Sequence, residues 1–327
     1  MNDSYYKYQK YQKKYYHLLN NINNNNNNML QRISNNNYNK EIKNIISLAD
    51  NVKIIGMAEA THGQKLITKF RIKVFKNLVK KCNYTVFILE DQYSCCELIN
   101  NYIKTGIGDP DDILLQLMWF WQSIDMLKLI IWMRKFNIIH DNILEFHGLD
   151  IQYICANNNN NSTLTNFAKK KFKENNKIDQ DDPVAADGYR DKSMFDIFMK
   201  IYHPSKKYFL YMHNYHIAKI DYMAIYKNRK SIKWLGMYLS NEFKENYYAI
   251  GNIFINGTYL ETDNNDKFTI MNKPPVVPQI DINKIPIGLT IYNTLHASKK
   301  NNKSNISEIF DAIMIIENEE PLKLISN

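Results

Sequence analysis

The chain contains little cysteine, proline or glycine, which account for 4, 8 and 10 of its 327 residues. Cys82 and Cys155 stand alone and Cys95 and Cys96 are adjacent, so the cysteines lack the paired spacing of a zinc ribbon or finger. No apolar run reaches the about eighteen residues that a membrane span needs, and the first residues lack the apolar core of a secretory signal. We therefore predict a cytoplasmic protein with free thiols and no membrane contact.

Several catalytic signatures are also missing from the sequence. There is no G-x-S-x-G segment, which argues against the nucleophile elbow of a serine hydrolase. There is no Walker loop and no G-x-G-x-x-G loop, so nucleotide chemistry is not supported. The H-E-x-x-H spacing of many zinc hydrolases is absent as well. No cofactor is expected from these observations.

Positive charge is concentrated near the N-terminus. Residues 1–40 hold six Lys or Arg against one Asp, so they carry +5 of the net charge of +9. The segment includes an Asn run from Asn23 to Asn28 and has too few apolar residues to offset the entropy lost on ordering. Since Asn and Lys enrichment also follows from an AT-rich coding bias, no nucleic-acid partner is predicted. We expect residues 1–45 to be a disordered or loosely attached tail and residues 46–327 to form a single domain.

The rest of the chain alternates between two patterns. Short apolar runs typical of buried strands are separated by segments whose apolar residues recur every three to four positions, as in amphipathic helices. This alternation predicts an α/β fold with a mostly parallel sheet covered on both faces. Strands are predicted at 52–57, 84–89, 143–148, 207–212, 246–254 and 308–316. Helices are predicted at 64–82, 92–104, 111–137, 190–203 and 231–244.

The stretch from Val52 to Glu90 carries the first candidate catalytic side chains. A predicted strand leads into a loop with Glu59 and His62, and a helix and a second strand ending at Glu90 follow. Two strands joined by one helix are nearly always parallel, so their carboxyl ends lie at one edge of the sheet, where ligands bind. We predict that His62 is a general base for water and that Glu59 or Glu90 is its carboxylate partner. The alternative is that Glu59 and His62 merely cap the helix.

Arg71 lies in an apolar part of the same helix, so its charge needs a partner if it is buried. We predict a bidentate pair with Glu90, the alternative being an ordinary surface arginine. His213 and His216 follow the apolar strand at 207–212. They are predicted to polarise the substrate carbonyl, hold its oxyanion or protonate the leaving oxygen, unless they are core histidines.

Two further residues are candidate substrate ligands. Asp150 ends a predicted strand and has two equally supported roles, one near the same crevice and one in a turn or helix cap. Arg190 is predicted to bind a carboxylate or another anion, and Asp191 to lie in the first turn of a helix beginning at Arg190.

A metal site is the alternative reading of the candidate catalytic residues. Histidine and carboxylate side chains suit zinc and other transition metals. Because Glu59 and His62 lack metalloprotease spacing, we predict no metal. The residues in question are His62, His213, His216, Glu59 and Glu90.

The segment G-M-A-E-A-T-H-G, followed by Arg71 and by a strand ending in Glu90, resembles the signature of the erythromycin esterase family. Further segments that resemble this family follow in order at 100–109, 132–137, 148–152, 189–191, 213–216 and 235–251. The resemblance implies a three-layer α/β/α fold, a place for Arg71 in the active site and hydrolysis without an obligatory metal. It also implies an ester or lactone substrate, with macrolides and antibiotic resistance as the family's association.

The sequence departs from this family in two places. Macrolide esterases have a long helical insertion before the segment matching Arg190, whereas 37 residues separate Gln152 from Arg190 here. We expect a short Asn-rich loop instead, and hence poor binding of macrolides. Leu66 also replaces a Glu that the family often places four residues after the His. The predicted function is an esterase or lactonase acting on a small molecule; the alternative is a non-catalytic descendant that binds a ligand or partner. The sequence does not indicate the oligomeric state.

Overall fold

The structure is a computed structural model that describes residues 35–155, 162–180, 182–221, 230–262, 268–271, 290–293 and 306–325. Its first half contains α2 (Asn35–Ala49), β1 (Ile54–Glu59), α3 (Lys65–Cys82), β2 (Tyr84–Gln92), α4 (Tyr93–Thr105), α5 (Pro110–Leu114), η1 (Trp119–Trp121), α6 (Ile124–Ile139) and β3 (Glu145–Asp150). The second half contains α7 (Thr163–Asn175), α8 (Pro183–Ile201), β4 (Lys207–His213), α9 (Asn214–Ile217), α11 (Leu235–Phe243), η2 (Lys244–Asn246), β5 (Tyr247–Gly257), β6 (Tyr259–Thr262), β7 (Phe268–Met271), β8 (Thr290–Asn293), α12 (Ile306–Ile309) and β9 (Ala312–Glu319).

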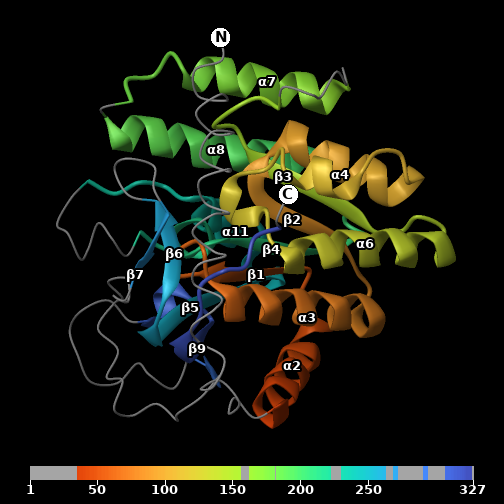
Figure 1. The fold of residues 1–327 in the computed structure, drawn as a ribbon. Coiled ribbons are helices and arrows are strands. Elements are labelled where there is room, and N and C mark those ends of the chain that lie inside the picture. Colours follow the sequence, from red (N-terminus) through yellow and green to blue (C-terminus); the bar gives the residue numbers. More distant parts are fainter. Residues whose placement is uncertain are drawn as a thin grey trace.

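The centre of the fold is a seven-stranded sheet in the order β3-β2-β4-β1-β5-β9-β8 (Figure 1). Neighbouring strands from β3 to β9 are parallel, and β8 pairs antiparallel with β9. β6 and β7 form a separate antiparallel pair. The predicted α/β/α fold with a mostly parallel sheet is confirmed. β1 and β2 are parallel as expected, but β4 lies between them.

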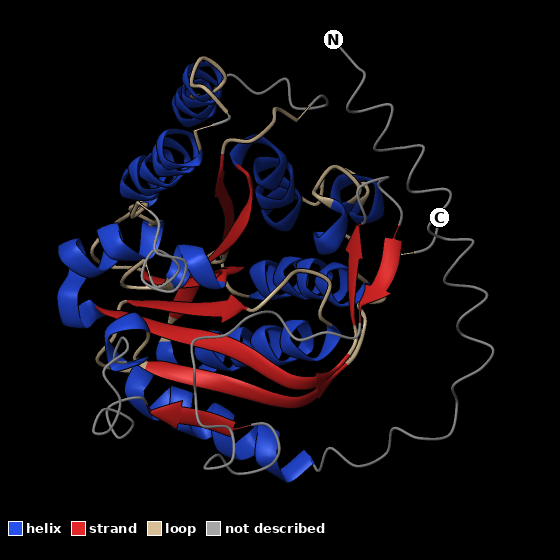
Figure 2. Ribbon diagram, turned by 90° about the vertical axis from the view of Figure 1, so that its left-hand side faces the viewer, coloured by secondary structure: helices blue, strands red, loops and turns tan. Residues whose placement is uncertain are grey.

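Helices lie on both sides of the central sheet (Figure 2), and alternate residues of a strand point to opposite faces. In β1, Ile55 and Met57 belong to the core shared with α2, α3 and α6, whereas Ile54 and Ala58 belong to the core shared with α8 and α11. Figure 1 accordingly shows α7 and α8 on the side of the molecule opposite to α2 and α3. Both faces of the sheet are therefore buried, which explains why its strands read as continuous apolar runs.

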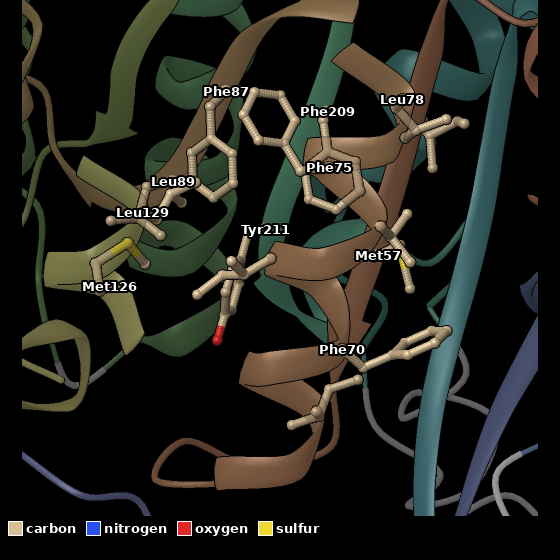
Figure 3. Packing of buried hydrophobic residues seen from close by; sticks show 14 of the residues in the cluster. Met57, Phe70, Phe75, Leu78, Phe87, Leu89, Met126, Leu129, Phe209 and Tyr211 are labelled. Atoms are coloured by element: carbon tan, nitrogen blue, oxygen red, sulfur yellow. The ribbon is translucent and has the colours of Figure 1, made fainter. Parts of the chain in front are cut away.

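Aromatic rings fill the core on the α3 side of the sheet (Figure 3). Phe75 of α3 lies edge-on to Phe87 of β2, with ring centroids 4.9 Å apart, and Phe87 lies 5.7 Å from Phe209 of β4. All three rings are fully buried. Each such side chain stabilises the fold by about 1.5–3 kcal/mol through burial alone, so this cluster fixes α3 against the strands that carry the site.

The prediction of one continuous helix at 111–137 is wrong. The chain forms α5, then η1, and begins α6 after Ser123, whose hydroxyl caps the helix by accepting the N–H of Met126 (3.1 Å). Just before it, the Gln122 side chain donates to the carbonyl of Leu117 (2.8 Å). Such local bonds from polar side chains compete with helix formation, and the apolar periodicity across the segment hides them.

Other predictions differ from the structure at their boundaries. The strand predicted at 308–316 starts instead at Ala312, after the short helix α12. The helix predicted at 190–203 begins at Pro183, after the N-cap Asp182. In place of the expected loop before it, the chain forms α7. The Asn run at 157–161 lies outside the described residues.

The N-terminal helix α2 crosses the predicted boundary between tail and domain. It packs against α3 and buries Ile42 and Ile45 in the core. The tail was predicted for residues 1–45, but residues 35–45 belong to this packed helix. Residues 1–34 lie outside the described residues, and for them the tail stays a prediction.

Candidate active site

The predicted site residues lie at the carboxyl end of the sheet. Glu59, Asp150 and His213 are the last residues of β1, β3 and β4, and Glu90 lies near the end of β2. Glu59 and His213 are direct partners across the β1–β4 pair. His62, in the turn before α3, completes this group. The crossover argument from the sequence therefore placed these residues at the correct edge.

His62 and Glu59 form a close pair. The Nδ1 atom of His62 lies 2.6 Å from Oε1 of Glu59, which is buried, while the His62 side chain is 30% exposed. A carboxylate next to Nδ1 holds the proton on that nitrogen and leaves the lone pair on Nε2. No hydrogen bond to Nε2 is present among the residues that the structure describes. His62 thus presents an unoccupied basic nitrogen.

Arg71 binds Glu59, so the predicted pair with Glu90 is wrong. Its Nη2 donates to Oε2 of Glu59 (2.5 Å), and its Nη1 donates to the carbonyl of Met57 (3.1 Å). The guanidinium also lies 3.3 Å from the centroid of the Tyr211 ring, in a cation–π contact. The carboxylate is thereby shared between a buried cation and the half-exposed imidazole. This arrangement fixes the direction in which Glu59 faces His62.

A glycine and side-chain hydrogen bonds fix the conformation of the loop that carries His62. Gly63 adopts φ +77°, and a Cβ there would meet the carbonyl of Leu260 at 2.0 Å, so glycine is required at this turn. The Gln64 side chain accepts the N–H of Ala60 (3.2 Å). It also donates to the buried Glu319 of β9 (3.3 Å), and burial raises the pKa of that carboxyl to about 8. Glu319 lies far along the chain and was not predicted.

Glu90 is the centre of a second, buried cluster. Its Oε1 lies 3.0 Å from Nε2 of His216 and 3.2 Å from Nη2 of Arg190, and its Oε2 accepts the backbone N–H of His213 (2.6 Å). Burial alone would raise the pKa of Glu90, but the charge and hydrogen bond of His216, together with the charge of Arg190, hold it well below its usual range. Glu90 is therefore a carboxylate at any ordinary pH.

His216 lies between two carboxylates. Its Nδ1 lies 2.8 Å from Asp191 and its Nε2 faces Glu90, and the side chain is 4% exposed. Burial opposes its charge, but the two carboxylates outweigh burial and raise the pKa of His216 to about 10. Asp191 lies in the interior of α8, not in its first turn as predicted, and also accepts the N–H of Leu235 (2.6 Å). His216 is thus a permanent cation with both nitrogens engaged.

Asp150 and Arg190 bind each other. The two Asp150 oxygens accept from Nε (2.9 Å) and Nη2 (2.8 Å) of Arg190, and Asp150 also accepts the N–H of Ile151 (2.7 Å). Asp150 is fully buried, whereas the Arg190 side chain retains 14% exposure. Asp150 therefore orients Arg190 at the carboxyl end of the sheet, and contact of Asp150 with a substrate stays a prediction.

His213 is neutral and held by the backbone. Burial and the neighbouring His62 lower its pKa to about 4, despite the opposing charge of Glu90. Its Nε2 lies 3.0 Å from the carbonyl of Ala60, and its Nδ1 accepts the N–H of Tyr215 (3.3 Å). Because a carbonyl can only accept, the proton lies on Nε2. His213 therefore presents an N–H toward the His62 loop.

The segment Trp119-Phe120-Trp121 supplies residues that the sequence did not reveal as part of the site. The Phe120 ring stacks on the imidazole of His62 at 3.8 Å and 6°, and the Trp121 ring meets it edge-on at 5.8 Å. The Trp121 indole N–H donates to the carbonyl of Glu90 (2.9 Å). Because one helix was predicted across 111–137, the contribution of these rings to the site was not recognised. The dense W-F-W sequence was the available signal.

Neither a metal centre nor a membrane span is found in the part of the chain that the structure describes. No group of three or more His, Cys, Asp or Glu side chains there is arranged to hold a metal ion. No described helix is both long enough and apolar enough to cross a membrane.

Comparison with solved structures shows the same fold elsewhere. A succinoglycan biosynthesis protein is 18% identical with a TM-score of 0.73, and a protein from Bacillus cereus is 15% identical with a TM-score of 0.71; each match covers 88% of this chain and 93% of the other. A mutant of the erythromycin esterase EreC in its open conformation is 14% identical with a TM-score of 0.59, covering 88% of this chain and 96% of the other. At these identities the likeness concerns the fold.

Comparison of the sequence identifies the family. No curated protein matches the chain. The sequence profile described as erythromycin esterase matches residues 79–181 and 159–279. The matched region includes Glu90, His213 and His216 and begins after Glu59 and His62. Since it spans more than half of the sequence, the chain belongs to the erythromycin esterase family.

Proposed function

We propose that the protein is a hydrolase that cleaves a small ester or lactone with a water molecule activated by His62. The observation that carries this proposal is the geometry of one side chain. His62 is bound through Nδ1 to a buried carboxylate at 2.6 Å, and its ring remains 30% exposed. A general base needs this combination of an oriented ring and an accessible second nitrogen.

The reaction follows from that geometry. Nε2 of His62 removes a proton from water as the water oxygen bonds to the carbonyl carbon, and the negative charge of Glu59 stabilises the imidazolium that forms. When the tetrahedral intermediate collapses, the bond from carbon to the leaving oxygen breaks. His62 then returns the proton to that oxygen, so the products are an acid and an alcohol. Arg71 takes no proton and keeps Glu59 in place.

The second cluster has a supporting part in this proposal. His213 is neutral and carries its proton on the nitrogen that faces Ala60. Its ring centroid lies 5.6 Å from that of His62, so its N–H is a candidate donor to the oxyanion once it exchanges the Ala60 carbonyl for the substrate. His216 is buried with both nitrogens engaged, and we assign it a fixed positive charge in place of direct substrate contact.

A hydrolysis panel tests the proposal. Short-chain esters, small lactones and erythromycin are incubated with the parent and with His62→Ala, and acid release is measured. The exposed His140 at the end of α6 offers a matched control as His140→Ala. Loss of the base should lower the rate by at least about 100-fold, and His140→Ala should retain it. Activity of His62→Ala within about threefold of the parent contradicts the assigned base.

Macrolides should be poor substrates within this proposal. A large macrolactone binds well when a concave site covers most of its surface. The segment between Gln152 and Arg190 is short, and its described part forms α7 and the start of α8. We expect the deficit for erythromycin to appear as a raised KM more than as a lowered kcat. A micromolar KM would show that another segment covers the substrate.

A binding protein without catalysis is the second candidate. It is favoured by the fact that both nitrogens of His213 and both nitrogens of His216 already have partners within the protein. In that case the parent and His62→Ala would be equally inactive on every member of the panel. Retention of Glu59, His62 and Arg71 in one bonded unit favours the enzyme.

A further inference from the structure

A continuous row of aromatic rings passes through the candidate site. It consists of Trp119, Phe120, His62, His213 and Tyr215, called the aromatic strip below. Successive ring centroids are 5.3, 3.8, 5.6 and 4.6 Å apart. All five residues are partly exposed. The proposed base thus stands in the middle of this order of contacts, with two rings before it and two after it.

Two buried tryptophans pack against rings of the aromatic strip. The buried Trp121 lies edge-on to Phe120 at 4.9 Å and is anchored by its hydrogen bond to the backbone of Glu90. At the other end Tyr215 stacks on the buried Trp234 at 5.5 Å and 20°. Rings that are fixed before binding lose little entropy when a ligand stacks on them.

Three carboxylates of the described residues near the aromatic strip are paired with cations of the protein. Glu59 pairs with Arg71 at 2.5 Å, Glu90 with His216 at 3.0 Å, and Asp150 with Arg190 at 2.8 Å. A charged substrate would have to compete with these buried pairs for a partner, at the cost of its own desolvation. The surroundings of His62 therefore favour an uncharged ligand.

Resting on the hydrolase function proposed above, we propose that the substrates are uncharged esters that carry planar aromatic rings on the acyl and alcohol sides of the scissile bond. Such rings would stack on the strip while the ester carbonyl lies at His62. Aromatic pairs in offset or edge-on contact gain binding energy beyond that of the buried area. Trp and Tyr are also the residue types enriched at binding hot spots.

Two matched esters test the proposed substrate class. Benzyl phenylacetate and cyclohexylmethyl cyclohexylacetate have the same connectivity, and a CH₂ group insulates the ester from each ring. The cyclohexyl compound buries more apolar surface, so a purely hydrophobic site would prefer it. We expect kcat/KM to be roughly tenfold higher for the benzyl ester, from two additional ring contacts. Equal values, or a preference for the cyclohexyl ester, overturn the proposal.

Variants at the two ends of the strip connect the preference to these rings. Trp119→Leu and Tyr215→Leu should each reduce the ratio between the two esters to about threefold. The matched control is Phe136→Leu, since Phe136 is a half-exposed ring that stacks on an imidazole, His140, at 4.1 Å. It lies near the end of α6, which leads into the start of β3 and therefore lies at the opposite edge of the sheet. Control and parent should show the same ratio. An unchanged ratio in both strip variants, with the fold verified by circular dichroism, overturns the proposal.

Binding of the corresponding amides separates this inference from the hydrolase proposal. N-benzylphenylacetamide and its dicyclohexyl counterpart resist hydrolysis, and their affinity is measured by calorimetry. Tighter binding of the benzyl amide by the parent, lost in Trp119→Leu, supports the strip even if no ester is hydrolysed. If the parent shows this preference but hydrolyses no ester, the hydrolase proposal is refuted, whereas the proposal of uncharged aromatic ligands stands. Equal affinity for both amides refutes the ligand class, whatever the hydrolytic activity.

Discussion

Two histidines of the candidate site make similar bonds in different surroundings. His62 and His216 each hold a carboxylate through Nδ1, at 2.6 Å from Glu59 and 2.8 Å from Asp191. His62 is 30% exposed with its second nitrogen unbonded among the described residues, whereas His216 is 4% exposed and faces a second carboxylate. What a histidine can do is therefore decided by the environment of its second nitrogen. His62 is placed to move a proton, and His216 is placed to keep one.

The largest expected difference between the two concerns stability. His216→Leu leaves Glu90 and Asp191 without their shared cation, so the free energy of unfolding should fall by about 3–5 kcal/mol. His62→Leu, at a half-exposed position, should cost less than about 1 kcal/mol. Urea denaturation of both variants measures the contrast. Similar losses for both would show that His216 is not the charged centre of its cluster.

The shared carboxylate Glu59 allows the structural and catalytic roles of the first pair to be separated. Glu59→Gln should destabilise the fold because Arg71 is then buried without a partner, whereas Glu59→Gln combined with Arg71→Met removes both charges and should lie within about 1–2 kcal/mol of the parent. The double variant should still show kcat reduced by about 10- to 100-fold, since a hydrogen bond to a charged group contributes about 1.5–3 kcal/mol.

The chain offers a matched control for that experiment. Glu145 lies 3.2 Å from His147, at the start of β3 and away from the site. Glu145→Gln should leave kcat unchanged. If the double variant is as active as the parent, Glu59 has a structural role and no catalytic one.

The pH dependence of stability should reveal His216. Its pKa rises from 6.5 to about 10 on folding, so the folded protein holds the proton more tightly. The resulting stabilisation is complete below pH 6.5 and is lost as the pH rises toward 10, with a slope approaching about 1.4 kcal/mol per pH unit. Glu319, whose pKa burial raises to about 8, acts in the same direction. To remove the contribution of Glu319, the free energy of unfolding is measured as a function of pH in the Glu319→Gln variant. A flat profile from pH 6.5 upward in that variant contradicts the fixed charge on His216.

Local sequence patterns were sufficient to predict most of the fold. Buried parallel strands are short apolar runs, and the helices between them carry a 3.6-residue stripe, so β1, α3 and β2 lie close to their predicted limits. Because strand ends follow from the same patterns, Glu59, Glu90 and His213 were predicted at the correct edge. The order of strands was not predictable in this way, and the insertion of β4 between β1 and β2 depends on contacts distant in sequence.

The pairing of charged groups depended on information that the sequence did not contain. Arg71 was expected to bind Glu90, but β4 separates β2 from β1, and the nearer carboxylate is Glu59. Phe120 was hidden in a segment whose periodicity resembled a helix, although Gln122 and Ser123 end that pattern. Such local polar bonds and long-range pairings are decided by three-dimensional packing.

The smallest expected effect concerns the support of the His62 loop. Glu319 accepts the N–H groups of Leu66 (2.6 Å) and Ile67 (3.4 Å), and so caps α3, whose own N-cap side chain makes no capping bond. Glu319→Ala should cost about 1 kcal/mol, as for the loss of other N-caps. Glu319→Gln keeps an acceptor oxygen and should cost less than half as much. Faster amide hydrogen exchange in the Ala variant should be confined to Leu66 and Ile67, whereas the Leu235 amide, bonded to Asp191 in the second cluster, should be unaffected. If the Leu235 amide also exchanges faster, the two clusters unfold together. The contrast between His62 and His216 then does not extend to the residues that surround them. If Gln is as costly as Ala, the cap depends on the ionisable carboxyl group and not on a simple acceptor.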